Sequence, residues 1–188
     1  NGASMSAVKN GKVVDTSMGL TPLQGLMMGT RCGDLDPAAV LYVMEKRGLD
    51  AAGMDKRMNK ESGLLGITGY SSDFRDIMKA SKEGDKRAKL AFEMFAYRVK
   101  SYIGAYSAAM GGVDAIAFTG GIGENAALVR EEICKGLEFL GVDFDFEKNT
   151  VRASGTVELT KPNSKVKVLK IETAEELMIA NDTYRLGK

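Results

Sequence analysis

The sequence predicts a fold of the α/β class, in which strands and helices alternate along the chain. Three observations support this prediction. A β-hairpin signal lies near the N-terminus, residues 85–110 have helical periodicity, and a short apolar run, Ala115 to Phe118, leads through glycines into a further helix. The apolar run is suited to a buried strand.

Length and charge limit the classes of protein to consider. The chain has 188 residues, 44% of them hydrophobic, which suits one globular domain, or one large domain with a small appendage. The 26 lysines and arginines nearly balance the 25 aspartates and glutamates. The resulting net charge of +1 is too small to attract nucleic acid or an acidic membrane surface, so we expect neither as a partner.

Missing residue types exclude several kinds of chemistry. The two cysteines, Cys32 and Cys134, form no CxxC pair, which favours neither a zinc site nor a disulfide framework and indicates a cytoplasmic protein. Histidine is absent, which excludes Ser-His-Asp, Cys-His and HExxH sites within this chain. We expect no membrane span or signal peptide. The chain opens at Asn1 in strand-like sequence, which indicates a start inside a longer protein.

The N-terminal third contains one hairpin and two helices. Asn10-Gly11 supplies the positive φ angles of a tight turn within a hairpin over 4–14. Asp36-Pro37 predicts a capped helix that runs to about Arg47 and stops at Gly48. A shorter helix is predicted near 51–60. The stretches without a clear period are 15–36 and 62–73.

The strongest periodic segment is a long helix that begins near Asp85 and ends at Gly111-Gly112. Apolar side chains recur every three or four positions along one face, which predicts the side that faces the core. These residues are Ala88, Phe92, Phe95, Val99, Ile103, Tyr106 and Met110.

The C-terminal third predicts a helix at about 125–140, strands near 151–158 and 165–171, and a last helix at about 174–185. Thr173 is the expected cap of the last helix, with Glu176 completing a capping box. The core candidates of the first of these helices are Leu128, Ile133, Leu137 and Leu140.

The segment from Phe118 to Asn125 is the strongest local signal for chemistry. A strand that turns through glycines into a helix leaves backbone N–H groups free to meet an anion or a nucleotide. The spacing matches neither the dinucleotide-binding GxGxxG pattern nor the Walker A pattern, whose lysine is missing. A tight turn that binds nothing is the alternative.

Several charged residues allow a functional and an ordinary interpretation. Arg31, in irregular glycine-rich sequence, could bind a carboxylate or phosphoryl group through two hydrogen bonds. Composition alone favours a surface arginine paired with Asp34 or Asp36. The charges at 73–76 are typical of a capped helix start, and Glu175 is typical of a helix first turn.

Four segments together resemble one known family. The run from Thr16 to Pro37, TSMGLTPLQGLMMGTRCGDLDP, closely resembles the signature of acetate kinases. The segments 62–67 with 73–76, 118–125 and 173–177 match the same family in order and spacing. The resemblance covers essentially the whole chain.

The resemblance implies a ribonuclease-H-like (actin-like ATPase) α/β fold, a mixed sheet flanked by helices, in the superfamily of sugar kinases, Hsp70 and actin. It implies reversible transfer of the γ-phosphoryl group of ATP to acetate, which gives acetyl phosphate and ADP, with Mg²⁺ (or Mn²⁺) as cofactor. By the same resemblance, Arg31 is the catalytic arginine and Glu175 the magnesium-linked glutamate. The implied nucleotide-binding residues are Asn1, Gly2, Asp73, Phe74, Arg75, Gly121, Ile122, Gly123, Glu124 and Asn125.

The chain departs from the family by lacking an N-terminal domain of comparable size. We therefore expect residues 1–188 to be the C-terminal nucleotide-binding domain of a two-domain kinase, inactive alone. Propionate kinase is the alternative within the enzyme class, and a non-catalytic module that binds nucleotide or dimerises is the alternative outside it. The resemblance also implies a homodimer, with the helix at 85–110 as a candidate contributor or an ordinary core helix.

Overall fold

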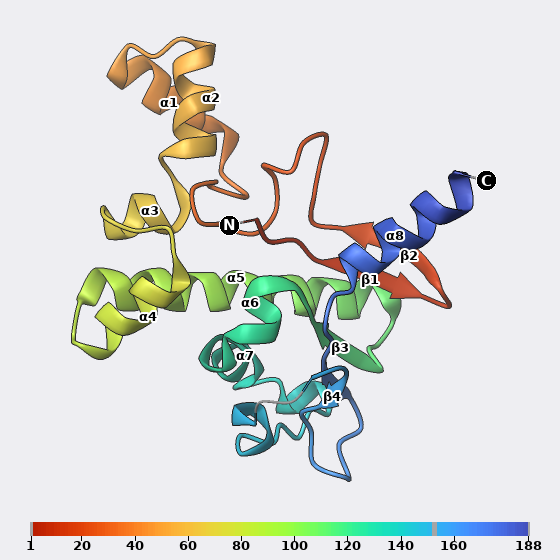
Figure 1. The fold of residues 1–188 in the computed structure, drawn as a ribbon. Helices are drawn as coiled ribbons and strands as arrows, with labels where there is room; N and C mark the ends of the chain where they lie inside the picture. Colours follow the sequence, from red (N-terminus) through yellow and green to blue (C-terminus); the bar gives the residue numbers. More distant parts are fainter. Residues whose placement is uncertain (1, 152–153, 188) are drawn as a thin grey trace. The chain divides into compact units, whose positions relative to one another are not determined.

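The computed structural model describes residues 2–151 and 154–187 and divides into two compact units, Asn1–Gly112 and Val113–Lys188 (Figure 1). The first unit contains a hairpin and helices α1 to α5. The second contains a small mixed sheet, three α-helices and two 3-10 helices.

The predicted hairpin is confirmed. Strand β1 (Ser6–Lys9) pairs antiparallel with β2 (Lys12–Thr16), and the turn between them uses Asn10 at φ 52° and Gly11 at φ 74°. Both angles are positive, as the turn type requires. Ala7 faces the core of the unit.

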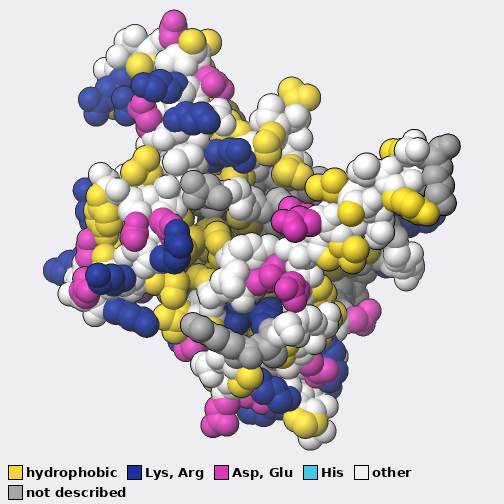
Figure 2. All heavy atoms as spheres, viewed as in Figure 1, with side chains coloured by type: hydrophobic (Ala, Val, Ile, Leu, Met, Phe, Trp, Pro, Cys, Tyr) yellow, Lys and Arg dark blue, Asp and Glu magenta, His cyan; other side chains and the backbone are white. Residues whose placement is uncertain are grey.

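The first two predicted helices are confirmed as well. Helix α1 (Pro37–Arg47) is capped by the Asp36 carboxylate, which accepts a hydrogen bond from the Ala38 N–H at 2.9 Å. Helix α2 (Ala51–Lys60) begins at Asp50 in the same way. Neither helix buries more than one residue, and Figure 2 shows Lys and Arg side chains gathered over this part of the chain.

The stretch predicted to be irregular at 62–73 contains a short helix, α3 (Gly63–Thr68). Its sequence is poor in helix formers, but its first turn is held by the preceding loop: the Leu64 N–H donates to the Met28 carbonyl at 2.9 Å, and the Leu65 N–H donates to the Gly29 carbonyl at 2.9 Å. Long-range bonds therefore outweigh local propensity here.

Helices α4 (Phe74–Lys82) and α5 (Lys86–Met110) pack on each other through Phe74 and Phe95, whose ring centroids lie 4.7 Å apart. Asp85 caps α5, and the helix ends at Gly111, as predicted. The predicted core face is confirmed: Ala88, Phe95, Val99, Ile103 and Tyr106 are buried, while Phe92 and Met110 are half-buried.

The sheet of the second unit has the order β3-β5-β4, with β3 (Ala115–Phe118) parallel to β5 (Lys167–Lys170) and β4 (Val157–Glu158) antiparallel to it. Among the described residues β3 is an edge strand, so only Ile116 of its four residues is buried. The strand predicted at 151–158 is confirmed only at its last two residues, and residues 152 and 153 lie outside the described ranges.

Helices α6 (Gly120–Asn125) and α7 (Ala127–Cys134) replace the single helix predicted at 125–140. Helix α7 ends early because Lys135 is extended and Gly136 has a φ of 85°. A 3-10 turn, η1 (Glu138–Leu140), follows. Ile133 and Leu137 are buried as predicted, whereas Leu128 and Leu140 are half-buried.

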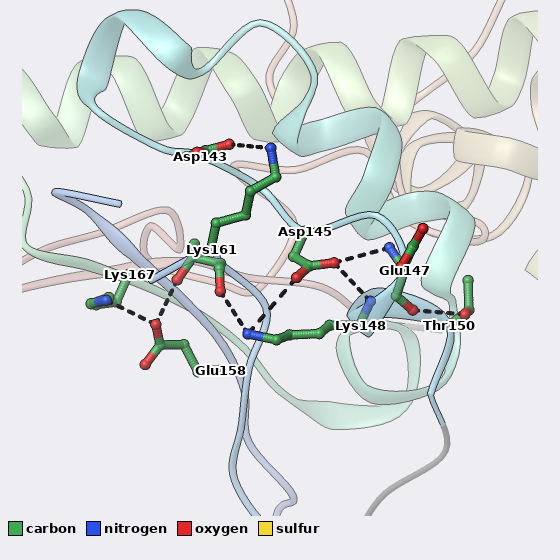
Figure 3. Close-up of polar contacts among 9 residues, drawn as sticks. Asp143, Asp145, Glu147, Lys148, Thr150, Glu158, Lys161 and Lys167 are labelled. Atoms are coloured by element: carbon green, nitrogen blue, oxygen red, sulfur yellow. Dashed lines mark hydrogen bonds and ion pairs between the residues drawn. The ribbon is translucent and has the colours of Figure 1, made fainter. Parts of the chain in front are cut away.

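The segments 141–151 and 154–167, here called the ion-paired layer, contain several ion pairs, which Figure 3 shows. Lys161 pairs with Asp143 at 3.0 Å, and Lys167 pairs with Glu158 at 2.8 Å. Because exposed pairs of this kind contribute about 0–1 kcal/mol each, the apolar side chains beneath them stabilise the layer more. These are Val142, Phe144, Leu159, Val166 and Val168, all buried.

The same layer contains a second 3-10 turn, η2 (Lys148–Thr150), which places Asn149 in the interior at 1% exposure. The last helix is α8 (Glu175–Leu186). No helix in the described ranges is long and apolar enough to cross a membrane.

Candidate active site

The predicted site residues divide between the two units. Gly2, Arg31 and the segment 73–75 belong to the first unit, and the segment 121–125 and Glu175 belong to the second. Asn1 lies outside the described residues.

Residues 25–34, here called the Arg31 loop, close back on themselves through the backbone. The Asp34 N–H donates to the Gly25 carbonyl at 2.9 Å. Gly33 adopts a φ of 70°, and a Cβ at this position would lie 2.4 Å from the Gly25 carbonyl oxygen. Only glycine allows this close approach of two backbone segments.

The Asp34 carboxylate ties the Arg31 loop to α5. Its Oδ1 accepts from the Gly25 N–H at 3.0 Å, and its Oδ2 accepts from the Tyr102 hydroxyl at 2.6 Å. Arg98, one turn earlier on α5, donates to the Asp34 carbonyl at 3.3 Å. Burial, and then the bond to Asp34, raise the pKa of the Tyr102 phenol, so Tyr102 remains a donor at neutral pH.

Arg31 is half-buried within this loop and has no ion pair with a carboxylate among the described residues. Its Nη1 donates to the Pro22 carbonyl at 3.3 Å and lies 3.5 Å from the Met28 sulfur. Asp34, one expected partner, bonds Tyr102 and Gly25 instead, and Asp36 caps α1. Since a guanidinium has five N–H donors, most of them remain available to an anion.

Cys32, the neighbour of Arg31, is half-buried. Its N–H donates to the Met58 carbonyl at 3.0 Å, which joins the Arg31 loop to α2. Burial raises the pKa of the Cys32 thiol, so it is the neutral thiol at physiological pH.

The segment 73–75 presents two charged side chains and one buried ring. Asp73 caps α4, and its carboxylate also accepts from Arg75 Nη2 at 2.5 Å and Nε at 3.0 Å. The side chain and the backbone N–H of Arg75 lower the pKa of Asp73 to about 2. Phe74 is 7% exposed and packs against Phe95, so its ring belongs to the core.

The glycine-rich segment is a short helix, α6, and a buried arginine holds its last turn. Arg130, 3% exposed, donates through Nη1 to the Gly123 carbonyl at 2.7 Å and the Glu124 carbonyl at 2.9 Å. Its Nε donates to Asn149 Oδ1 at 2.8 Å, and its Nη2 donates to the Asn149 carbonyl at 3.0 Å. Burial lowers the pKa of Arg130.

The sequence prediction does not include Arg130. The sequence does contain a signal for a buried arginine, because Arg130 precedes Ile133 and Leu137 at the spacing of one apolar helix face. A charge on such a face indicates a buried polar network, but the partner Asn149 cannot be read from the sequence.

The Glu124 carboxylate joins the start of α6 to the residues before α8. Its Oε1 accepts from the Gly120 N–H at 3.0 Å, the Thr173 N–H at 2.9 Å and the Thr173 hydroxyl at 2.7 Å. These bonds, led by that of the Thr173 side chain, lower the pKa of Glu124. The predicted capping box is therefore wrong: the Thr173 hydroxyl bonds Glu124, the N-cap residue of α8 is Ala174, and no side chain caps the helix.

Glu175 is the first residue of α8 and is exposed. The described residues contain no group of three or more Cys, Asp or Glu side chains that could enclose a metal ion. Mg²⁺ commonly binds through one or two carboxylates, substrate phosphates and retained waters. A single exposed carboxylate therefore fits a magnesium ion that is held mainly by nucleotide and water.

The fold and these sites define a class of protein. The mixed sheet flanked by helices is that of the ribonuclease-H-like (actin-like ATPase) class, as its solved neighbours show. Within this class, the model of the acetokinase family matches residues 1–181, and the chain belongs to that family.

Comparisons with individual proteins agree with the match to the family model. The chain is 65% identical over its full length to the acetate kinase of Fusobacterium nucleatum and covers 47% of that protein. The crystal structure of Porphyromonas gingivalis acetate kinase superposes on the whole chain with a TM-score of 0.95 at 52% identity, with 47% of that protein covered. A propionate kinase from Francisella tularensis gives a TM-score of 0.88 at 44% identity, over 96% of this chain and 46% of that one. The chain thus spans about half the length of the relatives that it matches.

Replacing Gly33 with alanine should lower the free energy of unfolding by about 2 kcal/mol or more, because the positive φ is strained and the new Cβ would meet the Gly25 carbonyl. Gly104→Ala is the matched control. A Cβ there meets nothing within 4 Å, and the better helix propensity should add about 1 kcal/mol of stability. Urea unfolding measures both changes, and an unchanged midpoint for Gly33→Ala would contradict the prediction.

Tyr102→Phe removes the donor from Asp34 Oδ2 and should loosen the Arg31 loop. We expect the Cys32 thiol to react about tenfold faster with an aromatic disulfide reagent, since a hydrogen bond to a charged group contributes about 1.5 kcal/mol. Cys134→Ser in every variant leaves Cys32 as the one thiol. Tyr97→Phe, an exposed position on the same helix, should leave the rate unchanged. Equal rates for the two tyrosine variants would show that the bond does not hold the loop.

Proposed function

We propose that this chain is the nucleotide-binding half of an acetate kinase. The full-length protein transfers the γ-phosphoryl group of ATP reversibly to acetate, giving acetyl phosphate and ADP. One observation supports this most directly: Arg31 lies in a loop fixed by Gly33 and Asp34, and its guanidinium has no carboxylate partner among the described residues. The acetokinase-family match and the names of the relatives give the reaction.

Arg31 acts on the transferring phosphoryl group in this proposal. Enzymatic phosphoryl transfer depends mainly on positioning and on neutralising the charge that spreads over the equatorial oxygens. A guanidinium held by a preorganised loop does this without reorganisation during the reaction. Its planar N–H donors can bond two phosphoryl oxygens at once.

The nucleotide is bound by two segments in this proposal. Asp73 and Arg75 present a fixed, charged pair at the start of α4 that suits contacts with the ribose and base. Gly121, exposed at the start of α6, brings its backbone close to the nucleotide without a side chain in between. Asn1 and Gly2 belong to a phosphate-contacting loop by family resemblance.

Glu175 would hold a magnesium ion through the waters of the ion, because a single exposed carboxylate suits such indirect binding. When bound, the ion would supply positive charge that offsets the negative charge of the nucleotide phosphates.

The rest of the site comes from sequence that the relatives have beyond the matched half. We propose that residues 1–188 together form the C-terminal domain of the full-length protein. Helix α8 supports this, because it buries none of its residues in the described structure and exposes large apolar side chains. These are Leu177, Met178, Ile179, Tyr184 and Leu186. We further propose that the protein is a cytoplasmic homodimer.

Propionate kinase is the second candidate, supported by the neighbour from Francisella tularensis. Acetate and propionate differ by one methylene, which changes binding in an apolar pocket by about 1–3 kcal/mol. The kcat/KM values of the full-length protein for the two acids distinguish the candidates. A module that only binds nucleotide or dimerises would turn over neither acid.

The isolated 188-residue chain should show negligible acetyl phosphate formation, because in this proposal the rest of the site comes from sequence that the relatives have beyond the matched half. Its affinity for ATP should also be weak. A coupled assay that traps acetyl phosphate as a hydroxamate and calorimetry with ATP test these expectations. Ordinary turnover, or a submicromolar dissociation constant, would contradict them.

In the full-length protein, Arg31→Ala should lower kcat about a thousandfold with little change in the KM for ATP, because the guanidinium acts mainly on the transition state. Arg31→Lys should recover little of this loss, since an ammonium cannot bond two oxygens in one plane. Arg57→Ala is the control, as Arg57 pairs with Glu61 on α2. A kcat for Arg31→Ala within a few-fold of the unmodified enzyme would remove Arg31 from the mechanism.

A further inference from the structure

One oxygen of Glu124 carries three hydrogen bonds, from Gly120 and from both the backbone and the hydroxyl of Thr173. We call this set of contacts the Glu124 bridge. It joins the first residue of α6 to the segment that enters α8, across 49 positions of sequence. Charge-assisted bonds of this kind are about twice as strong as neutral ones.

The α6 side of the Glu124 bridge is held in place by further contacts. Arg130 donates from the interior to the Gly123 and Glu124 carbonyls of α6, and Asn125 donates to the Gly121 carbonyl at 3.0 Å. A Cβ on Gly123 would lie 3.0 Å from the backbone of Phe118, so the helix also lies closely against the end of β3.

On the α8 side, none of the residues of the helix is buried and no side chain caps its first turn. The chain that enters α8 is held at three successive residues. The Ile171 N–H donates to the Phe118 carbonyl at 2.8 Å, the Glu172 carboxylate accepts from the Gly155 N–H at 2.8 Å, and Thr173 donates to Glu124. Thr173 is the last of these contacts before Glu175, which follows two residues later. We therefore infer that the direction of the Glu175 carboxylate depends on Thr173.

We propose that Glu124 is a positioning residue that fixes Glu175 relative to the glycine-rich helix α6 and does not itself contact the nucleotide. Oε1 of Glu124 already accepts three hydrogen bonds, and a carboxylate directed at phosphates would repel them. The inference rests on the proposed function, because Glu175 is there the residue that orients the nucleotide-bound magnesium ion. The Glu124 bridge thus holds α6 and the Glu175 carboxylate in one fixed arrangement.

The first test concerns geometry and needs no nucleotide. In ¹⁵N-labelled 188-residue chain, Glu124→Ala should speed exchange of the Gly120 and Thr173 amides about tenfold and change the orientation of α8 relative to α6, measured by residual dipolar couplings. Glu124→Gln, which keeps an oxygen acceptor, should restore both. Glu176→Gln, an exposed glutamate in the same turn, is the matched control. An unchanged orientation in Glu124→Ala would overturn the proposal.

A milder pair of variants covers the case in which Glu124→Ala does not fold. Thr173→Val removes one donor of the bridge and keeps the backbone bond. Its α8 should reorient in the same direction as in Glu124→Ala. Thr183→Val is its control, because the Thr183 hydroxyl bonds only the Ile179 carbonyl within α8.

The second test separates positioning from direct contact. ADP is titrated into the chain to millimolar concentration, with Mg²⁺ or with a chelator, and binding is followed by amide shifts. Glu124→Ala and Glu175→Gln should each remove most of the gain in affinity that Mg²⁺ gives, and the double variant should lose no more than Glu175→Gln alone. ADP affinity in the presence of chelator should be unchanged.

The outcomes are distinct. If the two substitutions lower ADP affinity additively, and equally with and without Mg²⁺, Glu124 contacts the nucleotide. If Mg²⁺ raises the ADP affinity of Glu124→Ala as much as that of the unmodified chain, the bridge is structural only. Either result overturns the proposal. If neither this chain nor the full-length protein binds ADP, the proposed function fails, while the orientation of α8 still decides whether Glu124 positions Glu175.

Discussion

In each unit one carboxylate satisfies the backbone of a segment that is too irregular or too short to satisfy itself. Asp34 does this for the Arg31 loop, and Glu124 does it for α6. Each also accepts a bond from a hydroxyl far away in sequence, that of Tyr102 or Thr173. Backbone N–H groups away from water must find acceptors, so segments without regular structure need such carboxylates to keep one conformation.

This constraint separates two kinds of candidate site residue. The Asp73–Arg75 pair forms within the first turn of α4 and needs only the local helix start. Arg31 and Glu175 instead depend on bonds made by neighbours, Asp34 in one unit and Thr173 in the other. Their positions are therefore sensitive to changes at residues that touch no ligand. Positioned catalytic groups generally depend on such supporting contacts.

The sequence predicts well the features that depend on neighbouring residues, and poorly those that depend on residues far away in the sequence. The Asn10-Gly11 turn, the cap at Asp36, the start of α5 near Asp85 and the buried face of α5 follow from neighbouring residues, and the structure confirms them. The helix at Gly63 and the role of Thr173 follow from partners elsewhere in the chain. Family resemblance predicted the site segments, but only coordinates show that Phe74 is a core ring and that Arg130 holds α6.

The interpretation of Arg31 depends on which groups the neighbouring carboxylates bond. Composition favours an ordinary surface ion pair, since Asp34 and Asp36 follow within five positions. In the structure both carboxylates form other hydrogen bonds. Asp34 accepts from Tyr102 of α5, and Asp36 caps the first turn of α1. An arginine that is half-buried, rigidly framed and without a carboxylate partner among the described residues keeps its charge available for a ligand. The same contacts that stabilise the loop thus leave the Arg31 guanidinium without a carboxylate partner among the described residues, as the role proposed for it requires.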